Sequence, residues 1–331
     1  MIAEAGVNHN GDLATALALV DAAAECGADA VKFQTFKADT IVRRDAKKAA
    51  YQEGQGPAGE TQYEMLKRLE LDHHMHLKIL DHCRARQIHF MSSAFDLDGI
   101  DYLRRLGMEL FKIPSGEIDN LPYLRKVGAI GRRVILSTGA SELEEVREAV
   151  EILTKAGTGL QNITVLHCCS QYPTLPEDVN LAAMLTMRDI LGVQVGYSDH
   201  TLGSQVAIAA TAMGATVIEK HLTLNSTDSR GPDHKASLDP AEFADLVRSI
   251  RIAERAMGDG VKRIATSEAA NRYVIRKSIV ASRRIERGEI LTGENVTVKR
   301  PQGGLSPMRW DAVIGSTALR EYKTDEGIDL L

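Results

Sequence analysis

Eight short apolar runs, each followed by a helix-like pattern, fill residues 1–258 of this 331-residue chain. Runs such as AVKFQ and RVILS have the length of strands, whereas LATALALVDAAAECG and SELEEVREAVEILTKAG place apolar residues at helical spacing. Eight strands that alternate with eight helices over about 250 residues are typical of a (β/α)8 TIM barrel. A doubly wound open sheet is the competing interpretation.

The pattern changes after residue 258. Residues 259–275 are polar and are expected to form a linker. Residues 276–331 contain the short β-like runs SIVAS and VTVKRP, several turns and a late helix-like segment, ALREY. The expected organisation is therefore an α/β barrel domain at 1–258, a linker at 259–275 and a small β-rich domain at 276–331.

Charge and composition argue against several classes of partner. The formal net charge is -5, and no basic block interleaves with aromatic residues, so neither nucleic acid nor an anionic membrane surface is expected. The weakly polar run at 206–218 is too short to cross a bilayer, and the N-terminal segment MIAEAGVNHNG lacks the features of a secretory signal. Four cysteines without metal spacing or a disulfide framework favour a reduced, cytoplasmic protein.

Polar residues stand at the carboxyl end of every expected strand, where a barrel of this type builds its active site. In chain order they are Glu4, Asn8, His9, Asn10, Lys32, Gln34, Ser92, Ser93, Lys112, Ser115, Glu117, Ser137, Thr138, His167, Ser170, Tyr172, Ser198, Asp199, His200, Glu219, Lys220 and His221. Charges inside a strand are costly to bury, so Glu4, Lys32, Lys112 and Glu219 need partners or a ligand.

Two kinds of site are predicted from these strand ends. Lys32 and Lys112, with serine hydroxyls and the turns PSGE and STGAS, supply the charge and donors that a phosphate or carboxylate needs. His200 and His221 end consecutive strands, which lie about 5 Å apart, so the two imidazoles can share a divalent ion. The alternative is that each is a hydrogen-bonded core histidine.

Two further stretches are interpreted as ordinary structure. The run DHHMH at 72–76 looks rich in metal ligands, but it opens an outer helix and is expected to be solvated surface. GQGPAG at 54–59 has the spacing of a dinucleotide fingerprint, but no strand precedes it. We expect it to belong to a lid over the barrel mouth, at residues 40–62.

Taken together, the motifs resemble those of the sialic acid synthases, which condense phosphoenolpyruvate with an N-acetylated sugar. The resemblance runs nearly end to end and is carried by EAGVNHNGD, VKFQT, KIPSGEIDN, ILSTGAS, LHCCSQYPT, GYSDHTLG, IEKHLT and RGPDHKASLDP. In the tail, RKSIVA, GEILTGENVTVKRP and GLSPM resemble the antifreeze-protein-like (SAF) domain that this family fuses to its barrel.

The resemblance implies a role for each matching residue. His200 and His221 would hold a catalytic divalent ion, with Mn²⁺ preferred over Mg²⁺ or Co²⁺, and Glu4 and Asp233 would be catalytic. Phosphoenolpyruvate would be bound by Lys32, Lys112, Ser115, Ser137 and Ser198. The sugar would be bound by Gln34, Glu117, Tyr172, Asp233 and Arg300. Arg300 would act in the partner subunit's barrel, which implies a domain-swapped homodimer.

The implied reaction joins phosphoenolpyruvate, N-acetylmannosamine and water into N-acetylneuraminate and phosphate. The metal would polarise the open-chain sugar aldehyde, and phosphate would leave by C–O cleavage after water has added. Glu4 and Asp233 would orient or deprotonate that water. One alternative is an N,N'-diacetyllegionaminate or related nonulosonate synthase, and an alternative of another class is a non-catalytic barrel that binds a carbohydrate or an anion.

Overall fold

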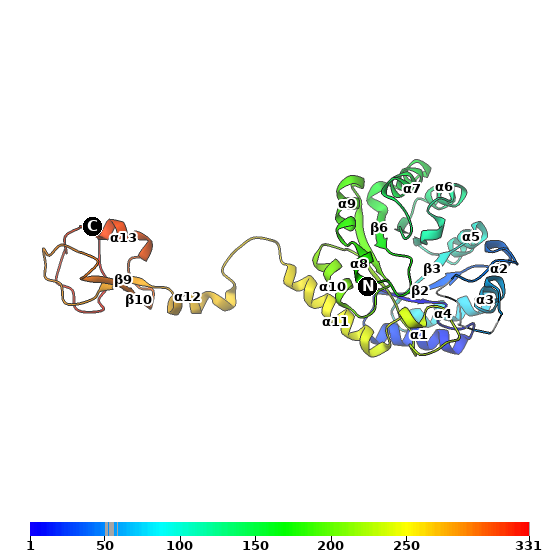
Figure 1. Ribbon diagram of the computed structural model, residues 1–331, viewed down its shortest axis with the longest axis horizontal. Coiled ribbons are helices and arrows are strands. Elements are labelled where there is room, and N and C mark those ends of the chain that lie inside the picture. Colours follow the sequence, from blue (N-terminus) through cyan, green and yellow to red (C-terminus); the bar gives the residue numbers. More distant parts are fainter. Residues whose placement is uncertain (50–51, 53–55, 58, 331) are drawn as a thin grey trace. The chain divides into compact units, whose positions relative to one another are not determined.

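The computed structural model in Figure 1 describes residues 1–49, 52, 56–57 and 59–330. The chain forms two compact units, which divide between Gly258 and Asp259. The second unit therefore includes the residues that the sequence assigns to a linker. Among the described residues, no helix is both long enough and apolar enough to cross a membrane.

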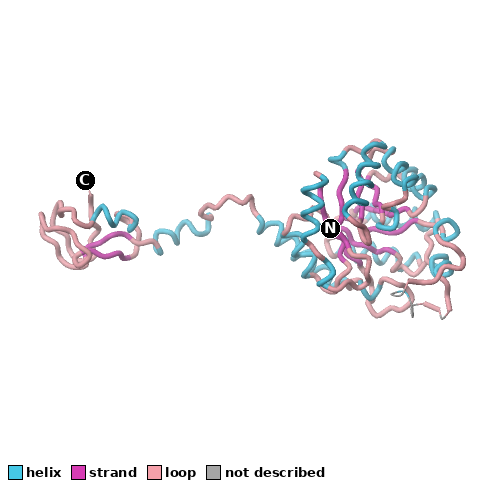
Figure 2. The backbone as a smooth tube through the Cα atoms, turned by 45° about the horizontal axis from the view of Figure 1, so that its top comes forward, coloured by secondary structure: helices cyan, strands magenta, loops and turns pink. Residues whose placement is uncertain are grey.

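The first unit is a closed barrel of eight parallel strands in sequential order, which confirms the predicted barrel and excludes the open sheet. The strands are β1 (Ile2–Gly6), β2 (Ala30–Thr35), β3 (His89–Ala94), β4 (Leu110–Ile113), β5 (Arg133–Ser137), β6 (Ile163–Cys168), β7 (Gln194–Asp199) and β8 (Ile218–His221). The barrel closes where β8 pairs with β1, with Glu4 opposite His221. Figure 2 shows the strands enclosed by helices.

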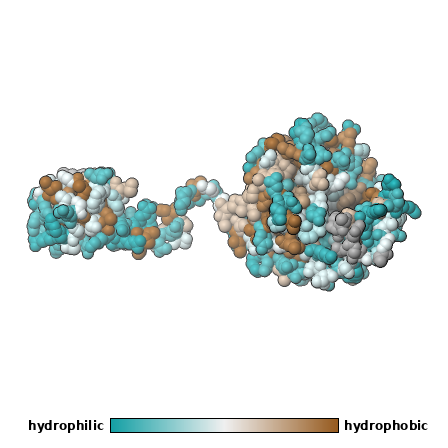
Figure 3. Space-filling view, viewed as in Figure 1, coloured by the Kyte–Doolittle hydropathy of each residue, from teal (hydrophilic) through white to brown (hydrophobic). Residues whose placement is uncertain are grey.

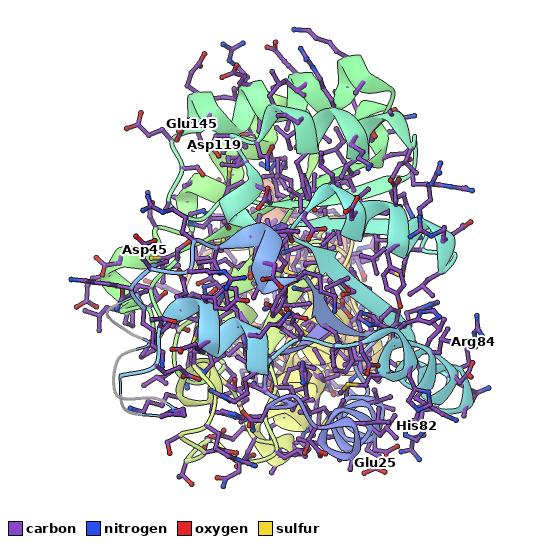
Figure 4. The ribbon with its side chains drawn as sticks, turned by 90° about the vertical axis from the view of Figure 1, so that its right-hand side faces the viewer. Glu25, Asp45, His82, Arg84, Asp119 and Glu145 are labelled. Carbon is purple, nitrogen blue, oxygen red and sulfur yellow. The ribbon has the colours of Figure 1, made fainter. Side chains whose placement is uncertain are left out.

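Helices form the outer layer of the barrel unit, where their apolar faces pack on the strands. They are α1 (Leu13–Glu25), α4 (His73–Ala85), α5 (Leu97–Arg105), α6 (Leu121–Ala129), α7 (Leu143–Ala156), α9 (Ala182–Leu191), α10 (Gln205–Ala212) and α11 (Pro240–Met257). Shorter helices lie in the loops after β2 and β6, namely α2 (Ala38–Ile41), α3 (Gln62–Arg68) and α8 (Pro176–Val179). Charged side chains such as Glu25, Arg84 and Glu145 project outward (Figure 4).

Side chains that face the barrel interior form two layers, because alternate residues of a strand point to the same face. The layer at the amino ends of the strands is apolar and comprises Ile2, Ala30, Met91, Leu110, Ile135, Leu166 and Val217. Two residues further along each strand, the next layer is mostly polar and comprises Glu4, Lys32, Ser93, Lys112, Ser137, Cys168, Ser198 and Glu219. The apolar layer closes the barrel beneath the polar one.

The second unit has its own small core. Its elements are α12 (Ala269–Ile275), β9 (Ser278–Ala281), β10 (Val296–Lys299) and α13 (Trp310–Val313), and β9 pairs antiparallel with β10. Ile279, Leu291, Val296 and Tyr322 are among the buried side chains that hold it together. This small antiparallel sheet is the β-rich domain expected from the sequence.

One local expectation for the second unit is wrong. The segment ALREY is not a helix, because Tyr322 is fully buried and its backbone pairs with that of Ile285. The polar stretch before β9 contains the helix α12, whose Tyr273, Val274 and Ile275 are each more than half exposed. Apolar surface is visible along this segment in Figure 3.

Candidate active site

A cavity of about 520 Å³ opens at the carboxyl ends of the barrel strands. It brings together every site residue that the sequence places in the barrel, namely Glu4, Lys32, Gln34, Lys112, Ser115, Glu117, Ser137, Tyr172, Ser198, His200, His221 and Asp233. Arg300 is different, since it belongs to the second unit, where it is exposed and directly follows β10.

Four charged side chains form the floor of this cavity. Lys32 Nζ lies 2.8 Å from Glu4 Oε2 and 3.6 Å from Glu219 Oε2. Lys112 Nζ lies 3.4 Å from Glu219 Oε1. All four side chains are almost fully buried, so their charges are compensated chiefly by one another.

The two carboxyl groups of the floor differ in their affinity for protons. Burial raises the pKa of Glu4 to about 7, and the adjacent Lys32 offsets only part of that effect. Burial acts on Glu219 in the same direction, but Lys112 and Lys32 together outweigh it and hold its pKa at about 2. Near neutral pH the floor therefore combines a stable carboxylate with a carboxyl group that can gain or lose a proton.

Serine hydroxyls and a glycine line the cavity next to Lys112. Ser137 Oγ is buried and has no hydrogen-bond partner among the described residues, so it is available to a ligand. The backbone N–H of Gly139 donates to Ser115 Oγ at 2.9 Å. A Cβ on Gly139 would lie 2.1 Å from Ser170 Oγ and 3.0 Å from Ser115 Oγ, so any larger residue there would displace these two hydroxyl groups. This corner can accept an anionic group.

His200 and His221 face each other at the ends of β7 and β8, with ring centroids 5.6 Å apart. His200 Nδ1 donates to the carbonyl oxygen of Cys169 at 2.6 Å, so the lone pair is on Nε2, which lies 3.5 Å from Ser198 Oγ and can coordinate a metal ion in place of that long contact. The ring of Tyr172 stacks on His200 at 4.0 Å. Burial lowers the pKa of His200 to about 4 and that of His221 well below its usual value, so both imidazoles are neutral near pH 7.

These two histidines fit a divalent ion in part. Neutral imidazole is the ligand form, and His221 Nδ1 is buried without a hydrogen-bond partner among the described residues. Within those residues no group of three His, Cys, Asp or Glu side chains has the geometry of a metal site. An ion held by His200 and His221 would therefore take its remaining ligands from water or substrate.

The loop after β8 carries Asp233 to the cavity, and the loop after β1 holds it there. Asn8 Nδ2 donates to the carbonyl of Leu222 and to Ser237 Oγ, each at 2.9 Å, and Ser237 Oγ donates to the Asp233 carbonyl at 2.7 Å. Asn10 bonds to His234 in the same loop. Asn8 and Asn10 thus fix the loop after β8 in place. Burial raises the pKa of Asp233 to about 6.

Several strand-end residues turn away from the cavity because of the alternation along each strand. Ser92 Oγ bonds to Thr35 Oγ1 at 2.7 Å, and His167 Nε2 bonds to the Val179 carbonyl at 2.6 Å. His76, expected on the solvated surface, is instead buried and contacts Thr35 Oγ1 at 2.9 Å. The sequence assigned no role in the site to Glu219 and indicated only that this buried charge needs a partner. In the structure Glu219 pairs with both lysines of the floor.

Part of the expected lid lies outside the described residues. Of GQGPAG, residues 54, 55 and 58 fall there, as do residues 50, 51 and 53 of the range 40–62. The described part reaches the loop after β8, since the N–H of Gly56 donates to the Ser229 carbonyl at 2.9 Å. The helices α2 and α3 flank this stretch and contribute Ile41, Gln62 and Leu66 to the cavity.

Fold and site together define the class of the protein, an enzyme of the sialic acid synthase type that carries a SAF domain. The chain belongs to the NeuB family, whose model matches residues 19–262, and the SAF domain model matches residues 276–330.

Two relatives and one solved structure show how close the similarity is. The N,N'-diacetyllegionaminic acid synthase of Campylobacter jejuni is 49% identical over 98% of this chain and 97% of its own. The enzyme of the same name from Legionella pneumophila is 47% identical over 96% of this chain and 89% of its own. The N-acetylneuraminic acid (sialic acid) synthetase of Leptospira borgpetersenii, solved with citrate, has a TM-score of 0.71 and 32% identity, covering 82% of this chain and 88% of that one.

Asp199 does not line the cavity; it supports the turn that carries His200. Its Oδ1 accepts from Thr201 N at 2.9 Å and from Thr201 Oγ1 at 2.8 Å, and its Oδ2 lies 2.8 Å from Lys220 Nζ. Lys220 also donates to the Thr201 carbonyl. Both charged side chains are completely buried, so the ends of β7 and β8 are joined by an ion pair shielded from water.

Removal of one partner of this pair should be costly. We expect Lys220→Met to lower the free energy of unfolding by about 3–5 kcal/mol, because Asp199 is left charged and unpaired in the interior. The measurement is urea unfolding followed by circular dichroism. The double variant Asp199→Asn/Lys220→Met should lose less than the single variant, since it leaves no buried charge. A double variant as unstable as the sum of both singles would contradict a coupled pair.

Proposed function

We propose that this protein is an N,N'-diacetyllegionaminate synthase that condenses phosphoenolpyruvate with 2,4-diacetamido-2,4,6-trideoxymannose and water. The observation that carries the proposal is the near full-length identity of 49% and 47% to two synthases of that name, together with a cavity that contains the expected groups. The sequence alone favoured N-acetylmannosamine as the sugar. The diacetamido sugar is better supported, because the two legionaminic acid synthases are 49% and 47% identical, whereas the N-acetylneuraminic acid synthetase of Leptospira borgpetersenii is 32% identical.

The sugar follows from the chemistry of the product. Removal of the three-carbon pyruvate unit from the nine-carbon acid leaves a six-carbon aldehyde sugar with acetamido groups at C2 and C4 and a methyl group at C6. In the forward reaction, C3 of phosphoenolpyruvate bonds to C1 of the sugar and water adds to C2 of phosphoenolpyruvate. The bond from C2 to the phosphate oxygen then breaks, which yields the keto acid and phosphate.

The residues of the cavity divide this work between them. Lys32, Lys112, Ser115, Ser137 and Ser198 would hold the phosphate and carboxylate of phosphoenolpyruvate, which fixes its nucleophilic carbon in place. The orphaned hydroxyl of Ser137 supports this assignment, since a bound anion would satisfy it. An anionic group bound beside the lysines would compete with Glu4 and Glu219 for the lysine ammonium groups.

The remaining groups would serve the sugar and the water. Gln34, Glu117 and Tyr172 would contact the sugar, and Glu4 and Asp233 are the candidate bases for the attacking water. Both have pKa values raised by burial, to about 7 and about 6, which suits a group that takes up a proton near neutral pH. A Mn²⁺ or similar ion held by His200 and His221 would supply Lewis acidity toward the sugar aldehyde.

Phosphate release from phosphoenolpyruvate tests the proposal. We expect release only when the diacetamido sugar and a divalent metal are both present, with the sugar consumed in equal amount. Chelation should abolish the activity, and Mn²⁺ should restore it. A protein that merely binds carbohydrate or anions would release no phosphate with any acetamido sugar, and that result would falsify the proposed reaction.

The metal assignment has its own control. His200→Ala and His221→Ala should each lose turnover and also lose Mn²⁺ binding, measured by titration calorimetry on protein stripped of metal. His73→Ala is the matched control, because His73 is an exposed histidine of α4 outside the cavity. Undiminished Mn²⁺ binding by both cavity variants would place the metal elsewhere.

The pH dependence of turnover can separate the two acidic residues. If Asp233 is the base, kcat/KM should fall as the pH drops through about 6, because protonation removes the base form. Asp233→Asn should lower the rate by about 10²–10⁴-fold and remove this acidic limb. Asp228→Asn, in the same loop, should keep the limb, since its hydrogen bonds with Arg230 hold the pKa of Asp228 at about 2. An acidic limb unchanged in Asp233→Asn would assign the role to another group.

We also propose that Arg300 works in the barrel of a partner subunit within a domain-swapped homodimer. Arg300→Ala and His221→Ala should each be inactive as pure proteins. After subunit exchange in an equal mixture, about a quarter of wild-type activity should return, since half of the dimers are mixed and one of their two sites is intact. No recovery, with exchange verified by mass spectrometry, would show that Arg300 does not act across subunits.

A further inference from the structure

The cavity has two chemically different sides. Its floor is charged, but its outer side, built from α2, α3 and the ends of β1 and β3, is lined by aliphatic and aromatic side chains. We call this side the apolar wall; it consists of Val7, Ile41, Val42, Met65, Leu66, Leu69 and Phe95. A sugar bound above the floor would therefore meet a wall with few hydrogen-bonding groups.

The apolar wall is anchored by its own small core. Val7, Met65 and Leu69 are nearly inaccessible to solvent and pack with Phe36, whereas Ile41, Leu66 and Phe95 pack against them but remain partly accessible. Met65 and Leu66 of α3 and its C-cap residue Leu69 have the spacing that a helix needs to present a continuous face. The capping box of Thr61 and Glu64 fixes where this helix begins.

Positive charge is confined to the floor. Among the described residues that line the cavity, Lys32 and Lys112 are the only lysines, and no arginine is present. Both lysines are already paired with Glu4 or Glu219. The apolar wall therefore offers no cation to a phosphate at the distal end of a sugar, and its seven side chains offer no hydrogen bond to distal hydroxyl groups. Gln52 and Gln62 also line the cavity and are its polar side chains from this stretch of the chain.

We propose that the apolar wall selects the sugar by packing against its C6 methyl group and the methyl of its C4 acetamido group. This inference rests on the proposed function and identifies the residues that would set its sugar specificity. Burial of these methyl groups against Leu66, Val42 and Phe95 removes apolar surface from water on both sides of the contact. N-acetylmannosamine has hydroxyl groups at C4 and C6, so it would gain less there.

Variants that make the apolar wall polar can test this selection. Leu66→Gln keeps length and helix propensity, and Val42→Thr replaces one methyl by a hydroxyl with little change in volume. Leu77→Gln on α4 is the matched control, since Leu77 is 40% exposed and does not line the cavity. Phosphate release is measured with the diacetamido sugar and with N-acetylmannosamine, and the latter is assayed as an inhibitor if it is not turned over.

We expect Leu66→Gln to lower kcat/KM for the diacetamido sugar about tenfold or more, with less than about a threefold change in kcat/KM or inhibition constant for N-acetylmannosamine. Val42→Thr should act in the same direction but more weakly, and Leu77→Gln should match the wild type. Equal losses for both sugars, or no loss for either, would overturn the inference while leaving the proposed function intact. Wild-type protein that does not turn over the diacetamido sugar would overturn the proposed function itself, and the inference with it.

Discussion

The buried ion-pair network of Glu4, Lys32, Glu219 and Lys112 is the constraint around which the barrel mouth is built. Four formal charges lie in a layer with almost no access to water, and each would be costly to bury alone. With both carboxyl groups ionised, the two carboxylates balance the two ammonium groups, and Glu219 links both lysines. Loss of any member leaves the others with an uncompensated charge, so the residues depend on one another for stability as well as for chemistry.

The two lysines compensate the charges of Glu4 and Glu219 to different extents, so the two carboxyl groups have different pKa values. Glu219 interacts with both lysines and remains a carboxylate, whereas burial outweighs the influence of Lys32 on Glu4. The barrel interior thereby holds a lasting carboxylate at Glu219 and an exchangeable proton at Glu4, which stands opposite His221 in the pairing of β1 with β8. A further anion beside Lys112 would meet an ammonium group with a single carboxylate partner among the described residues, and the unpaired hydroxyl of Ser137.

Sequence patterns could predict the barrel because strand and helix periods repeat eight times. The barrel residues to which the family resemblance gave a role all line one cavity. Patterns alone could not tell which strand-end residues face inward. Period-two alternation sends Glu219 and His221 into the cavity and Lys220 out of it, but this follows only once the register is known. The role of Asp199 was hidden for the same reason, since its partner Lys220 is 21 residues away.

Other predictions failed where tertiary contacts override local preference. ALREY has helical composition, yet burial of Tyr322 in the second unit and its backbone pairing with Ile285 impose an extended form. His76 lies near the start of α4 in a run of polar residues, yet its ring fills a buried position and bonds to Thr35. In both cases the burial of one side chain, which local sequence does not reveal, decides the outcome.

The charged floor is built from strands and the apolar wall largely from short helices. The groups proposed to carry the reaction and the groups proposed to select the sugar therefore belong to different elements. The floor comes from strand residues whose positions are set by barrel pairing and by the ion pairs. The apolar wall comes largely from α2 and α3, short helices in one loop whose small core is separate from the main barrel core. Changes in the apolar wall can therefore alter which sugar fits without disturbing the ion pairs of the floor.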